Sequence, residues 1–243
     1  MFGRHTNVAL QFSGGKDSIA CLMLLRDRLD SITVVWADSG DAFPETLAQM
    51  ELVKAMCPNF VCARGEQPEC IERNGFPVDI LPIENHPQIQ HLAQQRKLKL
   101  QGFMECCYRN ILKPLHDKTL ELGATLIIRG QKNCDRLKSP VRSGDVVDGI
   151  EYLFPLEDWS DARVLAFVQD SGLLPEHYQQ ANTSLDCMTC TAHLRDNGWK
   201  LPYLDAHHPS QAATVRHRLK LISQELEPTL HALSAAQGLP ARS

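Results

Sequence analysis

A short glycine-containing stretch near the N-terminus, SGGKDS at positions 13–18, constrains the fold of this chain more than any other feature. It follows the apolar run Val8 to Phe12, which is typical of a buried strand, and it leads into apolar residues at helical spacing from Asp17 to Leu29. Glycines let the backbone approach an anion closely, and the first amides of a helix have no partner within the helix. This order of strand, loop and helix therefore predicts a phosphate-binding site. The residues expected to form it are Ser13, Gly14, Gly15, Lys16, Asp17 and Ser18.

Further strand and helix patterns alternate along the rest of the chain. Strands are expected at Ile32 to Ala37, Phe60 to Ala63 and Thr125 to Arg129, and Gly144 and Gly149 mark a hairpin that ends in EYLFPL. Helices are expected at Pro44 to Met56, at 107 to 122 with Pro114 as a bend or a start, at Asp161 to Gln169 and at 209 to 236. This alternation predicts an α/β fold with a doubly wound, Rossmann-like parallel sheet. We expect a nucleotide-binding domain over 1–150 and a C-terminal segment over 151–243 that ends in a helix.

The charge and hydropathy of the chain limit its partners. The formal net charge is −4, so the composition does not support nucleic acid as a partner, although a local basic groove is compatible with it. No apolar run reaches the roughly 18 residues that a membrane span needs, and the first residues lack the pattern of a signal peptide. We therefore expect a cytoplasmic protein with no membrane partner.

The chain has nine cysteines, which in a reducing compartment indicate metal binding or chemistry where they cluster and burial where they are isolated. Two pairs stand out, Cys106–Cys107 and, roughly 80 residues later, Cys187–Cys190. A C-x-x-C pair alone fits zinc, a redox dithiol or an iron–sulfur cluster. Adjacent cysteines suit zinc poorly because structural zinc sites space their ligands, whereas they can ligate two irons of one cluster. The cysteines expected to be buried apolar residues are Cys21, Cys57, Cys62 and Cys70.

Two of these segments resemble the PP-loop families. SGGKDS is similar to the S-G-G-x-D-S loop of ATP pyrophosphatases and sulfonucleotide reductases, and WADSGDAFPETL is similar to the reductases' D-T-G-x-x-F-P-E-T. The resemblance implies the adenine nucleotide alpha hydrolase-like fold and an adenine nucleotide held by the loop. It also implies contacts from Asp38 and Gly40, with Lys16 and Asp38 taking part in catalysis.

A third segment, IIRGQKNCDR, departs from the pattern that it resembles. The reductases carry G-x-R-R-x-Q-S there, and their arginines bind the sulfate or phosphate. Gly130 matches, but Lys132 and Asn133 take the two arginine places and Asp135 takes the glutamine place. Lys132 still offers a charge to the nucleotide, without the bidentate fork of an arginine. The departure argues against an unmodified adenylyl sulfate substrate, unless Arg129 and Arg136 compensate.

The cysteine pairs resemble those of bacterial and plant-type adenylyl-sulfate reductases, which carry Cys-Cys, about 80 residues, then Cys-x-x-Cys. The flanks FPLEDWSDARVLAFVQDSGLLPEHY and TSLDCMTCT are similar to that family as well. The resemblance implies a 4Fe–4S cluster beside the nucleotide site. The ligands that it implies are Cys106, Cys107, Cys187 and Cys190.

One part of the reductase pattern is missing. Those enzymes attack sulfur with a cysteine in a C-terminal E-C-G-[LI]-H tail, and here no cysteine follows Cys190. The first hypothesis is therefore an ATP pyrophosphatase or adenylyl-transferring enzyme that uses Mg²⁺ with ATP, similar to the ATP pyrophosphatase subunit of DNA phosphorothioation systems. The second is a reductase of adenylyl sulfate or phosphoadenylyl sulfate that uses Cys134 as its thiol. The third is a non-catalytic module that senses nucleotide or redox state. The protein partner expected in the catalytic cases is a sulfur donor or a thiol reductant.

Overall fold

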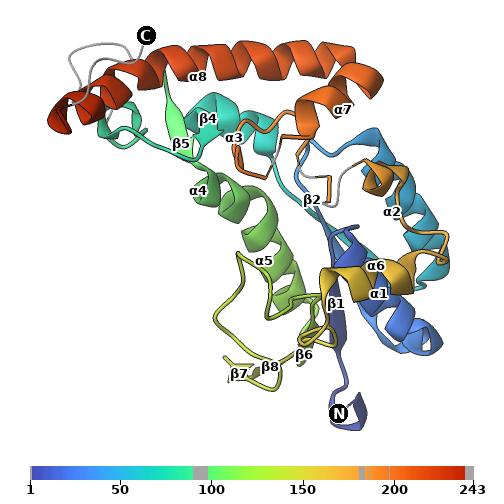
Figure 1. Cartoon of the computed structure of the whole chain (residues 1–243). Coiled ribbons are helices and arrows are strands. Elements are labelled where there is room, and N and C mark those ends of the chain that lie inside the picture. The colour runs from blue at the N-terminus through green and yellow to red at the C-terminus, as the bar shows by residue number, and fades with distance from the viewer. Residues whose placement is uncertain (1, 90–97, 181–183, 186, 197, 239–243) are drawn as a thin grey trace. The chain divides into compact units, whose positions relative to one another are not determined.

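The computed structural model describes residues 2–89, 98–180, 184–185, 187–196 and 198–238 (Figure 1). The chain divides into two compact units, each made of two separate stretches of sequence. The first comprises 1–65 and 110–186, and the second 66–109 and 187–243. Within the described residues, no helix combines the length and the apolar character that crossing a bilayer requires.

The first unit is built on a six-stranded sheet in the order β3-β2-β1-β6-β8-β7. All neighbours pair in parallel except β7, which runs antiparallel to β8 at the edge. The strand bounds are Val8–Phe12 (β1), Thr33–Asp38 (β2), Phe60–Arg64 (β3), Leu126–Ile128 (β6), Val146–Val147 (β7) and Ile150–Leu153 (β8). The order reverses direction on either side of β1, so the predicted doubly wound α/β sheet is confirmed, and ligands of such sheets bind at this switch point.

Helices cover both faces of this sheet. They are α1 (Lys16–Leu24), α2 (Pro44–Met56), α5 (Lys113–Glu121) and α6 (Asp161–Val168), with 3₁₀ turns at Phe2–Arg4 (η1), Arg26–Ser31 (η2) and Glu176–Gln179 (η5). The alternate residues Val8, Leu10 and Phe12 pack in one core with side chains of α1, α2 and α6. The intervening Ala9 packs on the opposite face with Leu115 of α5. Helices α1 and α6 lie side by side (Figure 1).

Most elements begin and end close to the predicted residues. The strand at Val8–Phe12 and the helices Pro44–Met56 and Pro209–Ala236 have the expected bounds. The segment expected as one helix over 107–122 is instead three pieces. These are α4 (Phe103–Cys107), a π-helical turn at Tyr108–Leu112 (η4) and α5, in which Pro114 is the second residue. Proline is tolerated there because the first amides of a helix need no partner within it.

The second unit contains a two-stranded parallel sheet and several helices. Their bounds are α3 (Gln67–Asn74), β4 (Phe76–Val78), η3 (Ile83–Asn85), β5 (Leu100–Gly102), α4, α7 (Lys200–His207) and α8 (Pro209–Ala236). Its core joins Val78 and Leu100 of the strands to Ile222 of α8. The expected domain boundary at residue 150 stays a prediction, and the compact units draw residues from both sides of it.

Candidate functional site

The loop 13–18 lies between the end of β1 and the start of α1, as expected for an anion site at the carboxyl edge of a parallel sheet. Gly14 has φ +82°, and a Cβ on it would lie 2.6 Å from Oε1 of Gln49 and 2.7 Å from Cε of Met50. A side chain here would strain the backbone at this positive φ and would push aside the ends of the Gln49 and Met50 side chains. The buried Gln49 fixes the loop in turn, because its amide donates to the carbonyls of Gly14 (3.0 Å) and Leu173 (2.9 Å).

Two backbone amides of the loop donate hydrogen bonds to side-chain hydroxyl oxygens. The amide of Lys16 donates to the hydroxyl of Tyr178 at 2.9 Å, and the amide of Gly15 donates to Oγ of Ser13 at 3.4 Å. Ser18 donates its hydroxyl to the Gly15 carbonyl at 2.8 Å. These amides therefore point at the kind of acceptor that a phosphate oxygen would replace.

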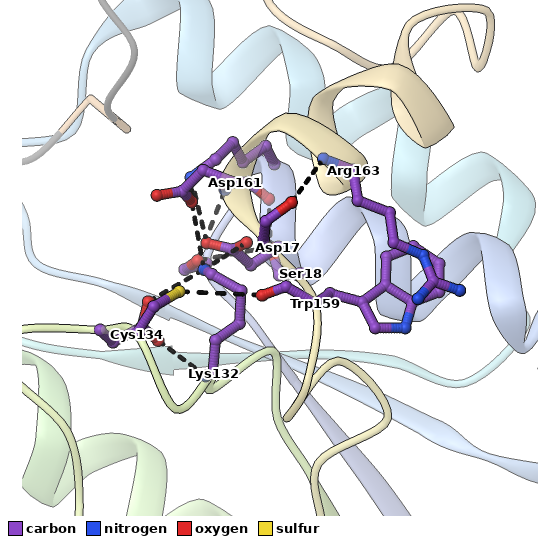
Figure 2. A network of polar contacts seen from close by, with 12 residues as sticks. Asp17, Ser18, Lys132, Cys134, Trp159, Asp161 and Arg163 are labelled. Carbon is purple, nitrogen blue, oxygen red and sulfur yellow. Dashed lines mark hydrogen bonds and ion pairs between the residues drawn. The ribbon is translucent and has the colours of Figure 1, made fainter.

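Five charged side chains form what we call the ionic cluster at the start of α1 (Figure 2). Its members are Lys16, Asp17, Lys132, Asp135 and Asp161. Nζ of Lys132 lies 2.7 Å from Asp17, 2.9 Å from Asp135 and 3.4 Å from Asp161. Nζ of Lys16 lies 2.8 Å from the same Asp161 oxygen and 3.4 Å from Asp17. Two cations and three carboxylates thus surround the place where the bound phosphate is expected.

Burial and charge act in opposite directions on Lys132. Its side chain is 1% exposed, and burial alone would lower its pKa, but hydrogen bonds to Asp17 and Asp135 raise that pKa above its ordinary value. The hydrogen bond from Lys16 is the main cause that lowers the pKa of Asp161, and Lys132 adds to it. Both shifts favour the charged forms of Lys132 and Asp161.

The approach of the 130–135 segment to α1 depends on Gly130. A Cβ there would lie 2.8 Å from the backbone carbon and the Cβ of Asp17. The absence of a side chain lets Lys132 reach the carboxylate of Asp17 across the sheet edge. The structure thus brings together Gly130 and Lys132 with the loop 13–18, two of the groups that the sequence singles out.

Cys134 follows the buried lysine but is itself exposed. Its thiol lies 3.7 Å from the backbone oxygen of Trp159, and the guanidinium of Arg163 stacks 3.9 Å above the Trp159 ring (Figure 2). Arg129 points elsewhere: it donates to Gln11 and lies over the ring of Tyr152, so it does not make up for the missing arginines.

Asp38 and Gly40 form a tight turn at the end of β2. Oδ1 of Asp38 accepts the amide of Gly40 at 2.9 Å, and Gly40 has φ +85°. Among the described residues, no hydrogen bond or ion pair joins Asp38 to the loop 13–18. Its expected part in catalysis and ligand contact stays a prediction.

The four paired cysteines all belong to the second unit. Cys106 and Cys107 end α4, and the amide of Cys190 donates to the Cys187 carbonyl at 3.2 Å. Lys200 donates to the carbonyls of both Cys187 (2.8 Å) and Cys190 (3.5 Å), which fixes the turn.

The two cysteine segments meet through a histidine. Nε2 of His193, three residues after Cys190, lies 3.9 Å from Sγ of Cys107. Four cysteine thiols suit an iron–sulfur cluster as ligands. Across the described residues, however, no three His, Cys, Asp or Glu side chains are placed to hold a metal. Asp186, inside the matching motif, lies outside the described residues. The cluster therefore stays a prediction.

Several site residues carry no sequence signal of their own. Gln49, Tyr178 and Asp161 reach the loop only through tertiary packing. Of the isolated cysteines, Cys21, Cys57 and Cys70 are buried as expected and Cys62 is half-buried.

The sheet, its switch point and the glycine loop at the start of α1 define a doubly wound α/β protein with a Rossmann-like sheet. Residues 7–193 match the family described as the phosphoadenosine phosphosulfate reductase domain, and the chain belongs to that family.

Individual relatives are more distant. The adenosine 5'-phosphosulfate reductase of Allochromatium vinosum is 26% identical over 188 residues, which are 73% of this chain and 65% of that protein. The chain thus matches less than two thirds of that relative.

Two solved structures also match, each with 14% identity. One is the phosphoadenylyl-sulfate reductase of Candida auris in a phosphate complex, with a TM-score of 0.48, covering 72% of this chain and 77% of that one. The other is the NH3-dependent NAD synthetase of Campylobacter jejuni, with a TM-score of 0.44 and coverages of 89% and 85%. Similarity at this level carries no argument about the reaction.

Proposed function

We propose that this chain is an enzyme that binds ATP, with Mg²⁺, at the loop 13–18 and transfers the adenylyl group in sulfur metabolism or in sulfur modification of nucleic acid. The observation that carries the proposal is the loop itself. It combines a positive φ at Gly14 that favours glycine, amides directed at oxygen acceptors, and Lys16 at the start of a helix.

The ionic cluster favours ATP over adenylyl sulfate. The arginine places of the reductase pattern hold Lys132 and Asn133, and the ammonium of Lys132 is already shared by three carboxylates. A buried lysine saturated in this way offers no free donor to a sulfate. Lys16, in contrast, pairs most closely with Asp161, whose side chain is half-exposed.

The proposed step is an attack at the α-phosphorus. An oxygen of the acceptor forms a bond to that phosphorus, the bond to the bridging oxygen breaks, and pyrophosphate leaves with the electron pair. Lys16 and the loop amides stabilise the negative charge that develops on the leaving group. Mg²⁺ bound with ATP supplies further charge neutralisation. Loss of Lys16 is expected to slow the step by roughly 10²–10³-fold, the size found for one charge-stabilising donor.

The test is release of pyrophosphate by the purified protein from ATP and Mg²⁺, with and without DNA. We expect release that Lys16→Ala slows by roughly 10²–10³-fold and that Lys54→Ala, which replaces an exposed lysine on α2, leaves unchanged. ATP binding without any turnover under all acceptor conditions would favour the non-catalytic sensing module instead.

A second function has a specific observation in its favour. Cys134 is an exposed thiol beside the ionic cluster, and the named relative is a reductase. In that case Cys134 would attack the sulfur of adenylyl sulfate or phosphoadenylyl sulfate, AMP or its 3′-phosphate would leave, and a thiol reductant would release sulfite. Sulfite production that is lost in Cys134→Ser and kept in Cys62→Ser would establish it.

We also propose that the two cysteine pairs ligate a 4Fe–4S cluster. The support is the shared unit, the ordered Cys187–Cys190 turn and the contact of Cys107 with the second segment through His193. Anaerobic reconstitution should give about four irons and four sulfides per chain with thiolate-to-iron absorption. Cys107→Ser should lose the bound iron and sulfide together with the thiolate-to-iron absorption. One bound zinc per chain without visible absorption would instead support a zinc site.

A further inference from the structure

A cavity lies in the first unit, on the loop that joins β6 to β7. Its volume is about 630 Å³, within the range of small-molecule sites. The polar residues that line it include Gln131, Asn133, Lys138, Ser139, Arg142 and Ser143. Nothing in the proposed chemistry at the loop 13–18 uses these residues.

The loop around this cavity is held by its own hydrogen bonds. Oε1 of Gln131 accepts the amide of Ser139 at 2.8 Å, and its Nε2 donates to the carbonyls of Ser139 (3.2 Å) and Val141 (3.3 Å). The carboxylate of Asp145 accepts the amide of Arg142 at 2.7 Å. A long connection with this much internal bonding is preorganised, which lowers the entropic cost of binding.

The lining carries a net positive charge, and its Lys138 ammonium donates one hydrogen bond to the Asn133 carbonyl at 2.6 Å. Lys138 and Arg142 contribute two positive charges and Glu157 one negative charge, in a chain of net charge −4. Within the described residues, the guanidinium of Arg142 makes no hydrogen bond or ion pair. Ser143 accepts the amide of Phe154 at 3.0 Å, so its hydroxyl hydrogen remains available. This lining suits a doubly charged anion.

The cavity and the ionic cluster share one segment of backbone. The side chain of Lys132 turns to the carboxylates at the start of α1, whereas its neighbours Gln131 and Asn133 line the cavity. The amide of Asn133 donates to the carbonyl of Glu157 at 2.8 Å, which ties the two walls together.

We propose that this cavity binds a phosphate monoester of nucleotide size, with Lys138 and Arg142 on the phosphate and Glu157 accepting from a hydroxyl of the ligand. The volume admits one nucleotide. The pairing of two cations with serine hydroxyls matches a monoester dianion better than the single charges spaced along a phosphodiester chain. This second site goes beyond the proposed function and does not depend on it.

The test is calorimetric titration of the whole chain with AMP. Wild type should show two binding events, Lys138→Gln/Arg142→Gln should lose one of them by at least tenfold in affinity, and Lys16→Ala should lose the other. The control Arg26→Gln/Lys54→Gln removes the same charge from exposed positions of the same unit and should keep both.

The outcomes separate the two sites. A single event that disappears in Lys16→Ala overturns the cavity site and leaves the proposed function standing. An event that depends on Lys138 and Arg142 alone keeps the cavity site and shows that AMP does not occupy the loop 13–18, where ATP is the proposed ligand. Binding of a single-stranded DNA oligonucleotide that requires Lys138 and Arg142, without AMP binding, overturns the monoester as ligand, as does the absence of any AMP binding.

Discussion

At the scale of single residues, the environment of each lysine decides its role. Lys132 stands in an arginine place of the family pattern, yet it is 1% exposed and surrounded by carboxylates, so it acts as a fixed internal counter-charge. Lys16 keeps a half-exposed partner in Asp161. We therefore expect replacement of Lys132 to lower the stability of the fold and replacement of Lys16 to weaken ligand binding.

Lys132→Met should destabilise the fold. It would leave the three carboxylates of the ionic cluster without their buried cation, at a cost of about 3 kcal/mol, the lower end of the range because these carboxylates are partly hydrated. Urea unfolding measures this, with Lys54→Met, an exposed lysine, expected within about 0.5 kcal/mol of wild type. Equal stability of the two variants would contradict the buried role of Lys132.

Asp161→Asn should strengthen nucleotide binding. The carboxylate of Asp161 lies 2.8 Å from Nζ of Lys16, where it competes with the phosphate for the ammonium. Removing its charge should raise the affinity for ATP about 1.5–5-fold, as expected for one partly exposed ion pair. Titration of the nucleotide measures it, and Asp170→Asn, beyond the end of α6, should be neutral. Weaker binding in Asp161→Asn would show that Asp161 supports the ligand instead.

The same pair predicts a dependence on pH. Because Lys16 and Lys132 lower the pKa of Asp161, its ion pairs stabilise the fold above the unfolded pKa of about 3.9 and lose that contribution as the pH falls through the lower folded pKa. The difference in melting temperature between wild type and Asp161→Asn should be constant from about pH 5 to 8 and shrink below about pH 4. A difference in melting temperature that grows as the pH falls would contradict the stabilising ion pairs of Asp161.

At the scale of elements, strands and helices with clear periodicity could be predicted and short or unusual ones could not. β1, α2 and α8 follow the sequence pattern. β4 and β5 have three residues each, too few for a periodic signal, and Pro77 within β4 argues against a strand. The ionic cluster was also beyond prediction, since Asp17, Lys132 and Asp161 come from three distant segments.

Gly14→Ala tests the loop as an element. The substitution meets both a positive φ, which costs about 1–2 kcal/mol, and the side chains of Gln49 and Met50 within 2.7 Å. We expect reduced stability and loss of nucleotide binding, measured by urea unfolding and titration. Gly172→Ala is the matched control, because it has φ +71° but no neighbouring atom within 4 Å. Gly172→Ala should lose only the stability that corresponds to the backbone strain, and its nucleotide affinity should equal that of wild type.

At the scale of the whole molecule, the family match identifies the kind of domain, whereas the choice of substrate depends on a few residues of the site. Membership in the phosphoadenosine phosphosulfate reductase domain family rests on residues 7–193. The choice between ATP and a sulfonucleotide rests on a local departure, namely Lys132 and Asn133 in the arginine places of the family pattern. The reaction must therefore be tested on the chain itself.

The most direct measurement is phosphorus NMR of the products that form from ATP and Mg²⁺ with the reconstituted full chain. We predict pyrophosphate together with AMP or an adenylylated acceptor, formed roughly 10²–10³-fold more slowly by Lys16→Ala. ADP with inorganic phosphate, or no turnover of ATP alongside sulfite release from adenylyl sulfate, would contradict attack at the α-phosphorus of ATP.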